Sequence, residues 1–316
     1  MAKIPERKVL CETKHLSREE WLEQRRKGIG GSDAGAIIGL NPWSSPYMVW
    51  ADKLGKLPPK EDNEAMRVGR DLEDYVASRF CEATGKKVQK RNQIFQHPQH
   101  EWMLANIDRQ VRGENAGLEC KTASALNLKS YKGQEFPDQY YAQCVHYMGV
   151  MGYDRMYLAV LIMGREFKIY TLERDEEEVQ SLIAAEEEFW NDYVMTEQAP
   201  PVDGTKATGE AQDAIYHGGS NEQIVLWDAD DKIKEYFRLK DSKSVIETQM
   251  EVIKQELQEE LADNEEGVTE NYKVTWKSQK RDTFDAKKFA KDHPDMDLSD
   301  YYKHSEYRVF KIKEVN

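Results

Sequence analysis

The sequence predicts an α/β fold in which a mixed central sheet is flanked by helices, with an appended long helix and a small α+β C-terminal unit. Strand-like stretches alternate with amphipathic helical patterns as far as residue 197. Residues 198–220 are rich in Pro, Gly, Thr and Ala, which is typical of a linker, and one long helical pattern follows them. We therefore expect a core at 1–197, a linker at 198–220 and an appended unit at 221–316.

Four predicted helices precede the first strands. Ser17 and Glu20 form a capping box that opens the first helix. A glycine-rich loop at 28–31 precedes the second, and no strand is predicted ahead of this loop. Pro46 suits the first turn of the third helix. The first helix covers about 17–27, the second runs from 32 to about 39, the third begins at 45, and the fourth covers about 63–84.

Three strands are predicted next, at 87–96, 103–111 and 117–122. The turn at 112–117 makes the last two an antiparallel hairpin. Further patterns complete the chain. They are a helix from Pro137 to about 152, a hairpin with strands at 156–162 and 166–172, an acidic helix at 175–196, a long helix at about 230–262, strands at 272–277 and 307–312, and a short helix at 286–292.

Composition narrows the classes of protein. No apolar run approaches the ~18 residues of a membrane span, and the N-terminal stretch lacks the apolar core of a signal peptide. Four cysteines without a CxxC pair fit reduced thiols in a cytoplasmic protein. An iron–sulfur cluster is disfavoured, because such clusters need four thiolates and no cysteine follows Cys144.

The net charge of −13 is unevenly distributed along the chain. Residues 1–174 hold 27 Lys and Arg against 23 Asp and Glu, whereas residues 175–316 hold 18 against 35. The acidity of the whole chain therefore does not exclude DNA binding. It locates any DNA-binding face in the first part of the chain.

The predicted hairpin carries three side chains suited to catalysis. Asp108 ends one strand, and Glu119 and Lys121 project from one face of the next, because side chains alternate along a strand. A surface salt bridge would explain Glu119 and Lys121 alone. Two carboxylates on adjacent strands can also converge on Mg²⁺, which prefers oxygen ligands. A lysine beside the ion could orient or deprotonate a water and stabilise charge on a phosphate, as phosphodiester hydrolysis requires.

Two helices offer further polar groups. Glu73 could add a carboxylate from the long helix, although Asp71 and Asp74 beside it also suit a solvated helical face. Gln143 and Tyr147 lie one helical turn apart on the helix after the hairpin. These two residues fit either the same site or the polar border of the core.

The glycine-rich loop is a candidate anion site. Gly30 and Gly31 precede a helix N-terminus, where backbone N–H groups and the helix dipole favour negative charge. Ser32 and Arg25 could complete a phosphate clamp. The sequence has no GxxxxGK[ST] motif, so neither an ATPase nor a dinucleotide-binding fold is supported.

Taken in order, these segments resemble the YqaJ-type viral recombinases, which are phage and prophage nucleases related to lambda exonuclease. The resemblance covers about residues 15–195. The residue before Asp108 is Ile107, whereas the family's motif begins with Pro. The matching motifs are R-x-x-G-I-G-G-S-D (25–33), N-P-W-S-S-P-Y (41–47), G-R-x-L-E (69–73), A-N-I-D (105–108), L-E-C-K-T (118–122) and Q-x-x-H-Y-M (143–148).

The resemblance implies a PD-(D/E)XK restriction-endonuclease-like core that acts on linear double-stranded DNA. It implies a metal ion, Mg²⁺ with Mn²⁺ as a substitute, held by Glu73, Asp108 and Glu119. Lys121 would stand at the attacking water, and Gln143 would be the polar residue of the core helix.

The same resemblance gives the loop a role and the protein partners. Arg25 and Ser32, next to Gly30 and Gly31, match the positions that hold a 5′ phosphate. The implied products are mononucleotides and a single strand, which a RecT-like single-strand annealing protein uses in recombination. A homo-oligomer, such as the related exonuclease's trimer, and the cytoplasm of a bacterial host carrying the phage or prophage are also implied.

Two other functions stay open at this point. A structure-specific endonuclease could use the same core. Alternatively, the chain could be a catalytically silent DNA-binding scaffold whose acidic C-terminal half recruits an annealing protein. The intact set of Asp108, Glu119 and Lys121 argues against silence, because DNA binding alone requires none of the three.

Overall fold

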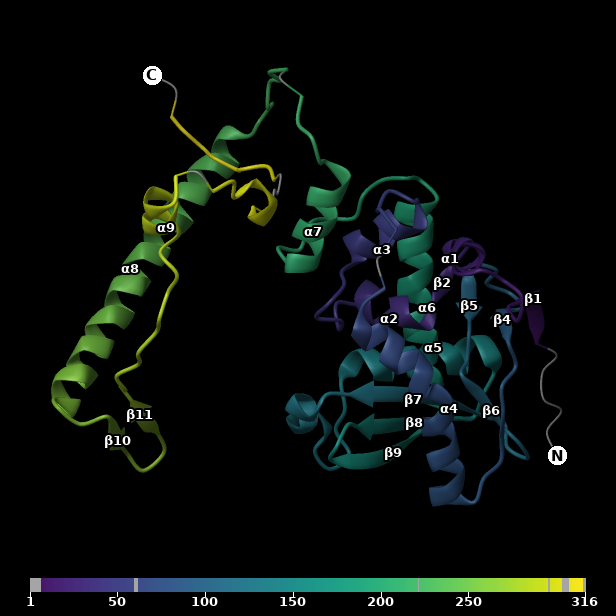
Figure 1. Cartoon of the computed structure of the whole chain (residues 1–316). Coiled ribbons are helices and arrows are strands. Elements are labelled where there is room, and N and C mark those ends of the chain that lie inside the picture. Colours follow the sequence, from purple (N-terminus) through teal and green to yellow (C-terminus); the bar gives the residue numbers. More distant parts are fainter. Residues whose placement is uncertain (1–6, 60–61, 221, 295, 303–306, 315–316) are drawn as a thin grey trace. The chain divides into compact units, whose positions relative to one another are not determined.

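The computed structural model describes residues 7–59, 62–220, 222–294, 296–302 and 307–314 (Figure 1). The chain forms two compact units, unit 1 ending at His217 and unit 2 beginning at Gly218. Among the described residues, no helix is both long and apolar enough to cross a membrane.

A mixed five-stranded sheet forms the centre of unit 1, which confirms the predicted fold class. Its strand order is β3-β6-β7-β8-β9, and only β7 and β8 run parallel. The predicted hairpin is the antiparallel pair β6–β7. The strands are β3 (Val88–Gln89), β6 (Arg109–Val111), β7 (Ala116–Ala123), β8 (Arg155–Ile162) and β9 (Glu166–Glu173).

Helices cover both faces of this sheet (Figure 1). α4 (Glu64–Thr84) packs Val76 and Phe80 on one face, against Leu118 and Tyr157. α5 (Asp138–Met151) packs on the opposite face, against Met156 and its alternating neighbours on β8. The alternation of side chains along β7 and β8 therefore separates an α4 face from an α5 face.

A second sheet of four short strands lies beside the first. Its order is β1-β4-β5-β2. The predicted strands at 87–96 and 103–111 were wrong as single strands, because each is divided between the two sheets, with residues 106–108 crossing from β5 to β6. The sequence also gave no signal for β1 or for the two-residue β2 ahead of the second helix. The strands are β1 (Lys8–Glu12), β2 (Ile29–Gly30), β4 (Gln93–Gln96) and β5 (Met103–Ala105).

The N-terminal helices begin where their capping signals predict. Ser17 Oγ accepts a hydrogen bond from the backbone N–H of Glu20, and the Glu20 carboxylate accepts one from the backbone N–H of Ser17, so the capping box is present. Pro46 occupies the first turn of α3. The helices are α1 (Arg18–Arg26), α2 (Gly31–Ile37), α3 (Pro46–Lys53), the 3₁₀ helix η1 (Ala125–Tyr131) and α6 (Glu176–Phe189), which continues as a wider helical turn, η2 (Trp190–Val194).

The segment predicted as a linker contains a helix, α7 (Lys206–Ile215), that belongs to unit 1. Thr205 caps its N-terminus, and Thr208 Oγ1 donates to Ser45 Oγ at 2.8 Å. Ala207, Thr208 and Ala211 are buried, because small side chains let α7 approach α3 closely. The division of the chain therefore falls after this helix rather than after residue 197.

Unit 2 is built around α8 (Asp230–Leu261), followed by the hairpin of β10 (Glu266–Val268) and β11 (Lys273–Thr275). α9 (Ala286–Asp292) lies where it was predicted, and a short 3₁₀ helix, η3, covers Ser299–Tyr301. The predicted strand at 307–312 was wrong, because these residues pair with no strand in the part of the chain that the structure describes. Phe310 instead packs edge-on against Tyr236 of α8, with ring centroids 6.2 Å apart.

Candidate active site

The hairpin β6–β7 turns three polar side chains away from α4. Leu118 faces α4 in the core, so Glu119 and Lys121 face the opposite side, toward α5. Asp108 stands at the entrance to β6, where its Oδ2 accepts a hydrogen bond of 2.8 Å from the backbone N–H of Cys120. This bond fixes the Asp108 carboxylate against the neighbouring strand, beside Glu119.

Glu119 is a buried carboxylate whose two oxygens have different surroundings. Its Oε1 accepts hydrogen bonds of 2.6 Å from Lys121 Nζ and 2.6 Å from Gln143 Nε2. Its Oε2 is buried, and none of the described groups donates a hydrogen bond to it. A buried anionic oxygen without a donor is costly. This oxygen can therefore accept a further hydrogen bond or coordinate a cation.

Burial and mutual repulsion shape the ionisation of this cluster. Burial raises the pKa of Asp108 well above its ordinary value, and the nearby charges of Glu119 and Glu73 raise it further. Burial alone would lower the pKa of Lys121, but Glu119 and Asp108 raise it above the ordinary value for lysine. Lys121 is consequently an ammonium, which also lies over the Tyr140 ring at 4.9 Å from its centroid.

Glu73 reaches the same cavity from α4 but is paired with cations. Its Oε1 accepts hydrogen bonds of 2.5 Å from Arg109 and 2.9 Å from Lys90. Arg109 is itself buried and also donates to the Asp108 carbonyl at 2.6 Å. Within the described parts of the chain, no three His, Cys, Asp or Glu side chains converge as a complete metal-binding group. The two carboxylates free of such pairing with arginine are Asp108 and Glu119.

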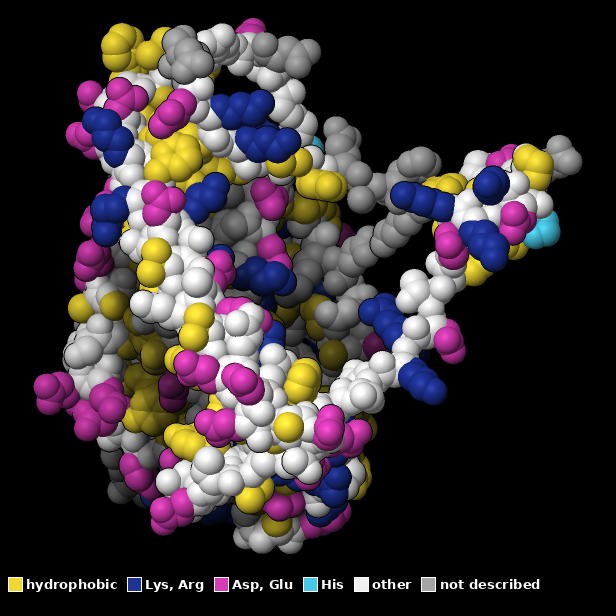
Figure 2. Space-filling model, turned by 90° about the vertical axis from the view of Figure 1, so that its left-hand side faces the viewer, with side chains coloured by type: hydrophobic (Ala, Val, Ile, Leu, Met, Phe, Trp, Pro, Cys, Tyr) yellow, Lys and Arg dark blue, Asp and Glu magenta, His cyan; other side chains and the backbone are white. Residues whose placement is uncertain are grey.

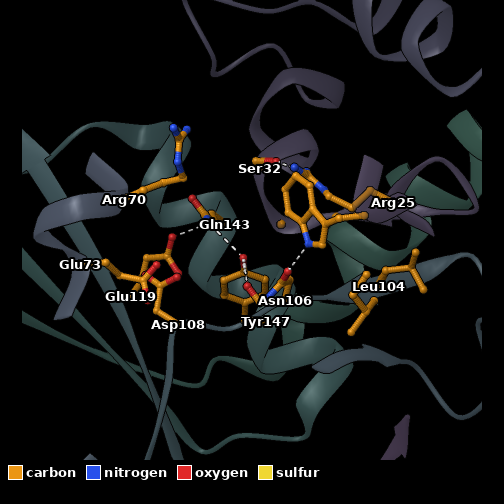
Figure 3. A pocket seen from close by; sticks show the side chains of 14 residues that line it. Arg25, Ser32, Arg70, Glu73, Leu104, Asn106, Asp108, Glu119, Gln143 and Tyr147 are labelled. Carbon is orange, nitrogen blue, oxygen red and sulfur yellow. Dashed lines mark hydrogen bonds between the residues drawn. The ribbon is translucent and has the colours of Figure 1, made fainter. Parts of the chain in front are cut away.

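One cavity of about 300 Å³ joins the hairpin to the glycine-rich loop. Figure 3 shows the carboxylates of Glu73, Asp108 and Glu119 on one side of this cavity and Arg25 and Ser32 on the other. Eight of the nine predicted site residues line the cavity. The ninth, Lys121, contacts Glu119, which lines it. The eight are Arg25, Gly30, Gly31, Ser32, Glu73, Asp108, Glu119 and Gln143.

The loop side of the cavity presents a cation and a hydroxyl together. Arg25 donates to Ser32 Oγ at 2.5 Å, and its guanidinium lies 4.9 Å from the Trp21 ring centroid. The loop needs glycine where it approaches other elements. A Cβ on Gly31 would lie 2.6 Å from the Tyr147 ring, and one on Gly28 would lie 2.3 Å from a backbone carbonyl. The loop backbone therefore packs directly against Tyr147 of α5 and Leu104 of β5.

A buried ion pair between α3 and α2 fixes the position of this loop. Lys53 Nζ donates to Asp33 Oδ2 at 2.6 Å, and the same oxygen accepts the backbone N–H of Gly30 at 2.9 Å. Burial alone would raise the pKa of Asp33, but Lys53 and Arg25 lower it to about 2. Asp33 therefore stays charged and orients both the Gly30 backbone and Arg25, whose guanidinium lies 3.7 Å from Asp33 Oδ1.

A second buried pair lies under α5. His146 Nδ1 contacts Glu186 at 2.8 Å, and His146 Nε2 donates to the Leu104 carbonyl at 2.9 Å. Both side chains are fully buried. Burial alone would lower the pKa of His146, but the charge of Glu186 raises it. Acceptors at both ring nitrogens favour the doubly protonated imidazolium. This pair connects α5 to α6, and His146 also connects α5 to β5, whose Leu104 lines the cavity.

Three cavity residues with hydrogen-bonding side chains, Trp21, Arg70 and Asn106, were not predicted as site residues from the sequence. Trp21 precedes Arg25 by one helical turn on α1, so the helical spacing was an available signal. Its Nε1 donates to Asn106 Oδ1 at 2.8 Å, and Asn106 occupies the crossing between the two sheets. Arg70 lies on α4 almost one turn before Glu73. Tyr147 was left open by the sequence. It lines the cavity with Gln143, and its hydroxyl donates to the Asn106 carbonyl.

Comparisons with known proteins place the chain in a family. Residues 20–154 match the YqaJ-like viral recombinase domain. The uncharacterized protein YqaJ of Bacillus subtilis (strain 168) is 41% identical over 313 residues, which cover 98% of each chain. This chain belongs to the YqaJ-like viral recombinase family.

Solved structures resemble the chain more distantly. An alkaline exonuclease from Laribacter hongkongensis, LHK-Exo, is 19% identical, with a TM-score of 0.49 over 57% of this chain and 94% of that one. The structure of LHK-Exo in complex with dAMP gives a TM-score of 0.48 over the same shares. A phage-related exonuclease from Haemophilus somnus 129PT is 14% identical, with a TM-score of 0.39 over 54% of this chain and 96% of that one.

Proposed function

We propose that this member of the YqaJ-like viral recombinase family is a Mg²⁺-dependent deoxyribonuclease that trims linear double-stranded DNA from its 5′ ends. The observation that carries the proposal is Glu119. One of its oxygens is held by Lys121 and Gln143, and the other is buried and receives no hydrogen bond from any described residue. Two hard oxygen donors facing one cavity fit a divalent cation.

The residues that would hold Mg²⁺, or Mn²⁺ in its place, are Asp108 and Glu119. Glu73 would join them after giving up its pairing with Arg109 and Lys90. The bound ion would polarise a phosphoryl oxygen and lower the pKa of a water ligand. A cation would also favour the ionised form of Asp108, whose pKa is raised by burial and by the charges of Glu119 and Glu73.

Lys121 acts as a charge rather than as a base. Its raised pKa keeps the ammonium protonated at neutral pH. In this role it stabilises the negative charge that develops on the phosphate, while Tyr140 and Glu119 fix its position. Gln143 orients Glu119 from the α5 side through its 2.6 Å hydrogen bond.

The 5′ end is bound on the loop side in this proposal. A terminal phosphate there would receive hydrogen bonds from Arg25 and Ser32, and charge-assisted bonds of this kind are strong. Because one cavity contains both groups of residues, a strand whose end is held by Arg25 can extend toward Asp108 and Glu119. Digestion from the 5′ end would leave the complementary strand single. A RecT-like annealing protein would bind that single strand, in the cytoplasm of a bacterial host.

The test is digestion of matched duplexes by the purified chain. Linear duplexes with 5′ phosphates should be degraded to mononucleotides and a single strand with Mg²⁺ or Mn²⁺, but not with chelator. Duplexes with 5′ hydroxyls should be degraded more slowly. A circular duplex should survive, and its cleavage would indicate an endonuclease instead. Degradation that persists in chelator would overturn the metal requirement. Co-purification of a RecT-like protein with the full chain tests the partner separately.

A further inference from the structure

α8 carries an apolar seam that the described residues of unit 2 leave largely exposed, although the Tyr236 ring at its N-terminal end contacts Phe310. Apolar residues recur along it at alternating spacings of three and four. The seam consists of Tyr236, Leu239, Ile246, Met250, Ile253 and Leu257, with Lys243 at the one polar position. All six apolar side chains are exposed, and the surface of unit 2 shows hydrophobic side chains between charged ones (Figure 2).

The spacing of the seam is that of a coiled coil. Its seven positions follow the heptad repeat, in which positions a and d face a partner helix. An amphipathic helix that packs on its own domain follows a period of 3.6 residues and buries that face. Here the period is 3.5, and only Leu261 is buried in the whole helix. Most helical stability in proteins comes from packing, so α8 lacks the packing that a helix of this length normally has.

Charges beside the seam suit pairing with another copy of this chain. In a parallel, in-register pair, Glu235 of one chain lies opposite Lys240 of the other, and the same attraction occurs twice. Antiparallel pairing with Tyr236 opposite Ile253 would instead set Glu235 against Glu256, and the attraction it allows between Lys240 and Glu247 would only offset that repulsion. We propose that α8 forms a parallel coiled coil with α8 of another copy of this chain, and that this seam makes the protein a homo-oligomer.

The first test measures the mass of the full chain in solution by sedimentation over a wide range of concentrations. The wild-type chain should associate, and the measured mass gives the number of chains. The double variant Ile246→Glu/Ile253→Glu should raise the dissociation constant by about a thousandfold or more, because it places charges in the buried seam. Glutamate is a good helix former, so the helix itself is retained.

A matched control lies on the same helix. Val245 and Val252 are 58% and 48% exposed, close to the 55% of Ile246 and the 57% of Ile253, but they lie off the seam. Val245→Glu/Val252→Glu should leave association unchanged. A wild-type chain that is monomeric at every concentration would overturn the proposal. So would association that survives the seam variant, or that is lost equally in the control.

Two further variants do not depend on loss of association. Lys243→Leu should lower the dissociation constant about tenfold or more, because it replaces a charge in the seam with an apolar side chain. A gain of this kind cannot come from misfolding. Met250→Cys should form a disulfide between chains on oxidation, since parallel pairing brings position 250 next to its own copy. The wild-type chain, whose four cysteines are free, is the background. An associated Met250→Cys chain that forms no such crosslink would overturn the parallel arrangement.

Discussion

Unit 1 and the α8 helix of unit 2 use charged residues in opposite ways. In unit 1, Lys53 with Asp33 and His146 with Glu186 form ion pairs inside the protein, around the loop and the helix that line the cavity. On α8, pairs such as Arg238 with Glu235 are spaced three or four residues apart along the exposed helix surface. Unit 1 therefore uses charge to fix geometry, whereas α8 keeps its charges in water.

The apolar residues show the converse difference. Unit 1 buries its large side chains in three clusters that hold the two sheets, α4 and α5 together. The apolar seam of α8 is left exposed. Unit 1 thus buries its own apolar clusters, while within unit 2 the apolar seam of α8 stays largely exposed. Site chemistry and assembly are consequently separable, and variants in each region should affect different measurements.

The largest expected effect is on catalysis in unit 1. Lys121→Ala should lower the rate of DNA hydrolysis by about 10²–10³-fold, because it removes the ammonium that contacts Glu119. Duplex binding, measured with chelator present, should change little. Hydrolysis at the wild-type rate would show that the buried charges of unit 1 do not form the catalytic centre.

The buried pair under α5 should contribute strongly to stability. Glu186→Gln should lower the free energy of unfolding by about 3 kcal/mol, because it leaves His146 in the interior without its counter-charge. Denaturant unfolding measures this difference. The double variant His146→Leu/Glu186→Leu should recover most of the loss, since an apolar pair of similar size needs no desolvation of charge. Equal losses in both variants would mean that packing, rather than charge, matters at this position.

Acid should weaken the loop support in unit 1. The pKa of Asp33 in the folded protein is about 2, below its ordinary 3.8, so its contribution is present above about pH 4 and is lost as the pH falls toward 2. The stability difference between the wild type and Asp33→Asn should therefore shrink by about 2 kcal/mol over this range. Urea unfolding at several pH values measures it. A difference that does not vary with pH would contradict the charged state of Asp33.

The smallest effect is expected on the surface of α8. Lys254→Ala removes an exposed pair with Glu251 three residues away, and the free energy of unfolding should change by only about 0.5 kcal/mol or less. The same unfolding experiment provides the measurement. A loss comparable to that of Glu186→Gln would mean that charges on α8 are as important as those inside unit 1, and the contrast between the regions would disappear.

Local signals predicted much of the fold. Two helix starts were predicted from such signals: the capping box at Ser17 and Glu20, and Pro46 in the first turn of α3. Each signal acts within one helical turn, so the sequence alone reveals it. Short strands were less readable. Residues 103–111 look like one strand, yet Asn106 to Asp108 cross between two sheets, and only the neighbours of each half decide that division. The helix α7 was missed because its small residues gain their stability from packing on α3.

In the candidate site, too, some features follow from local sequence and others only from tertiary packing. Strand alternation alone placed Glu119 and Lys121 on one face, because that geometry is set by the backbone. Only the tertiary structure brought Arg25 and Ser32 into the same cavity as Asp108, paired Glu73 with Arg109, and buried Lys53 against Asp33. The sequence determined which elements form and which side chains share a face, since those follow from interactions between neighbours in the chain. Which charges become buried and paired depends on distant segments packing together, and no local pattern encodes that.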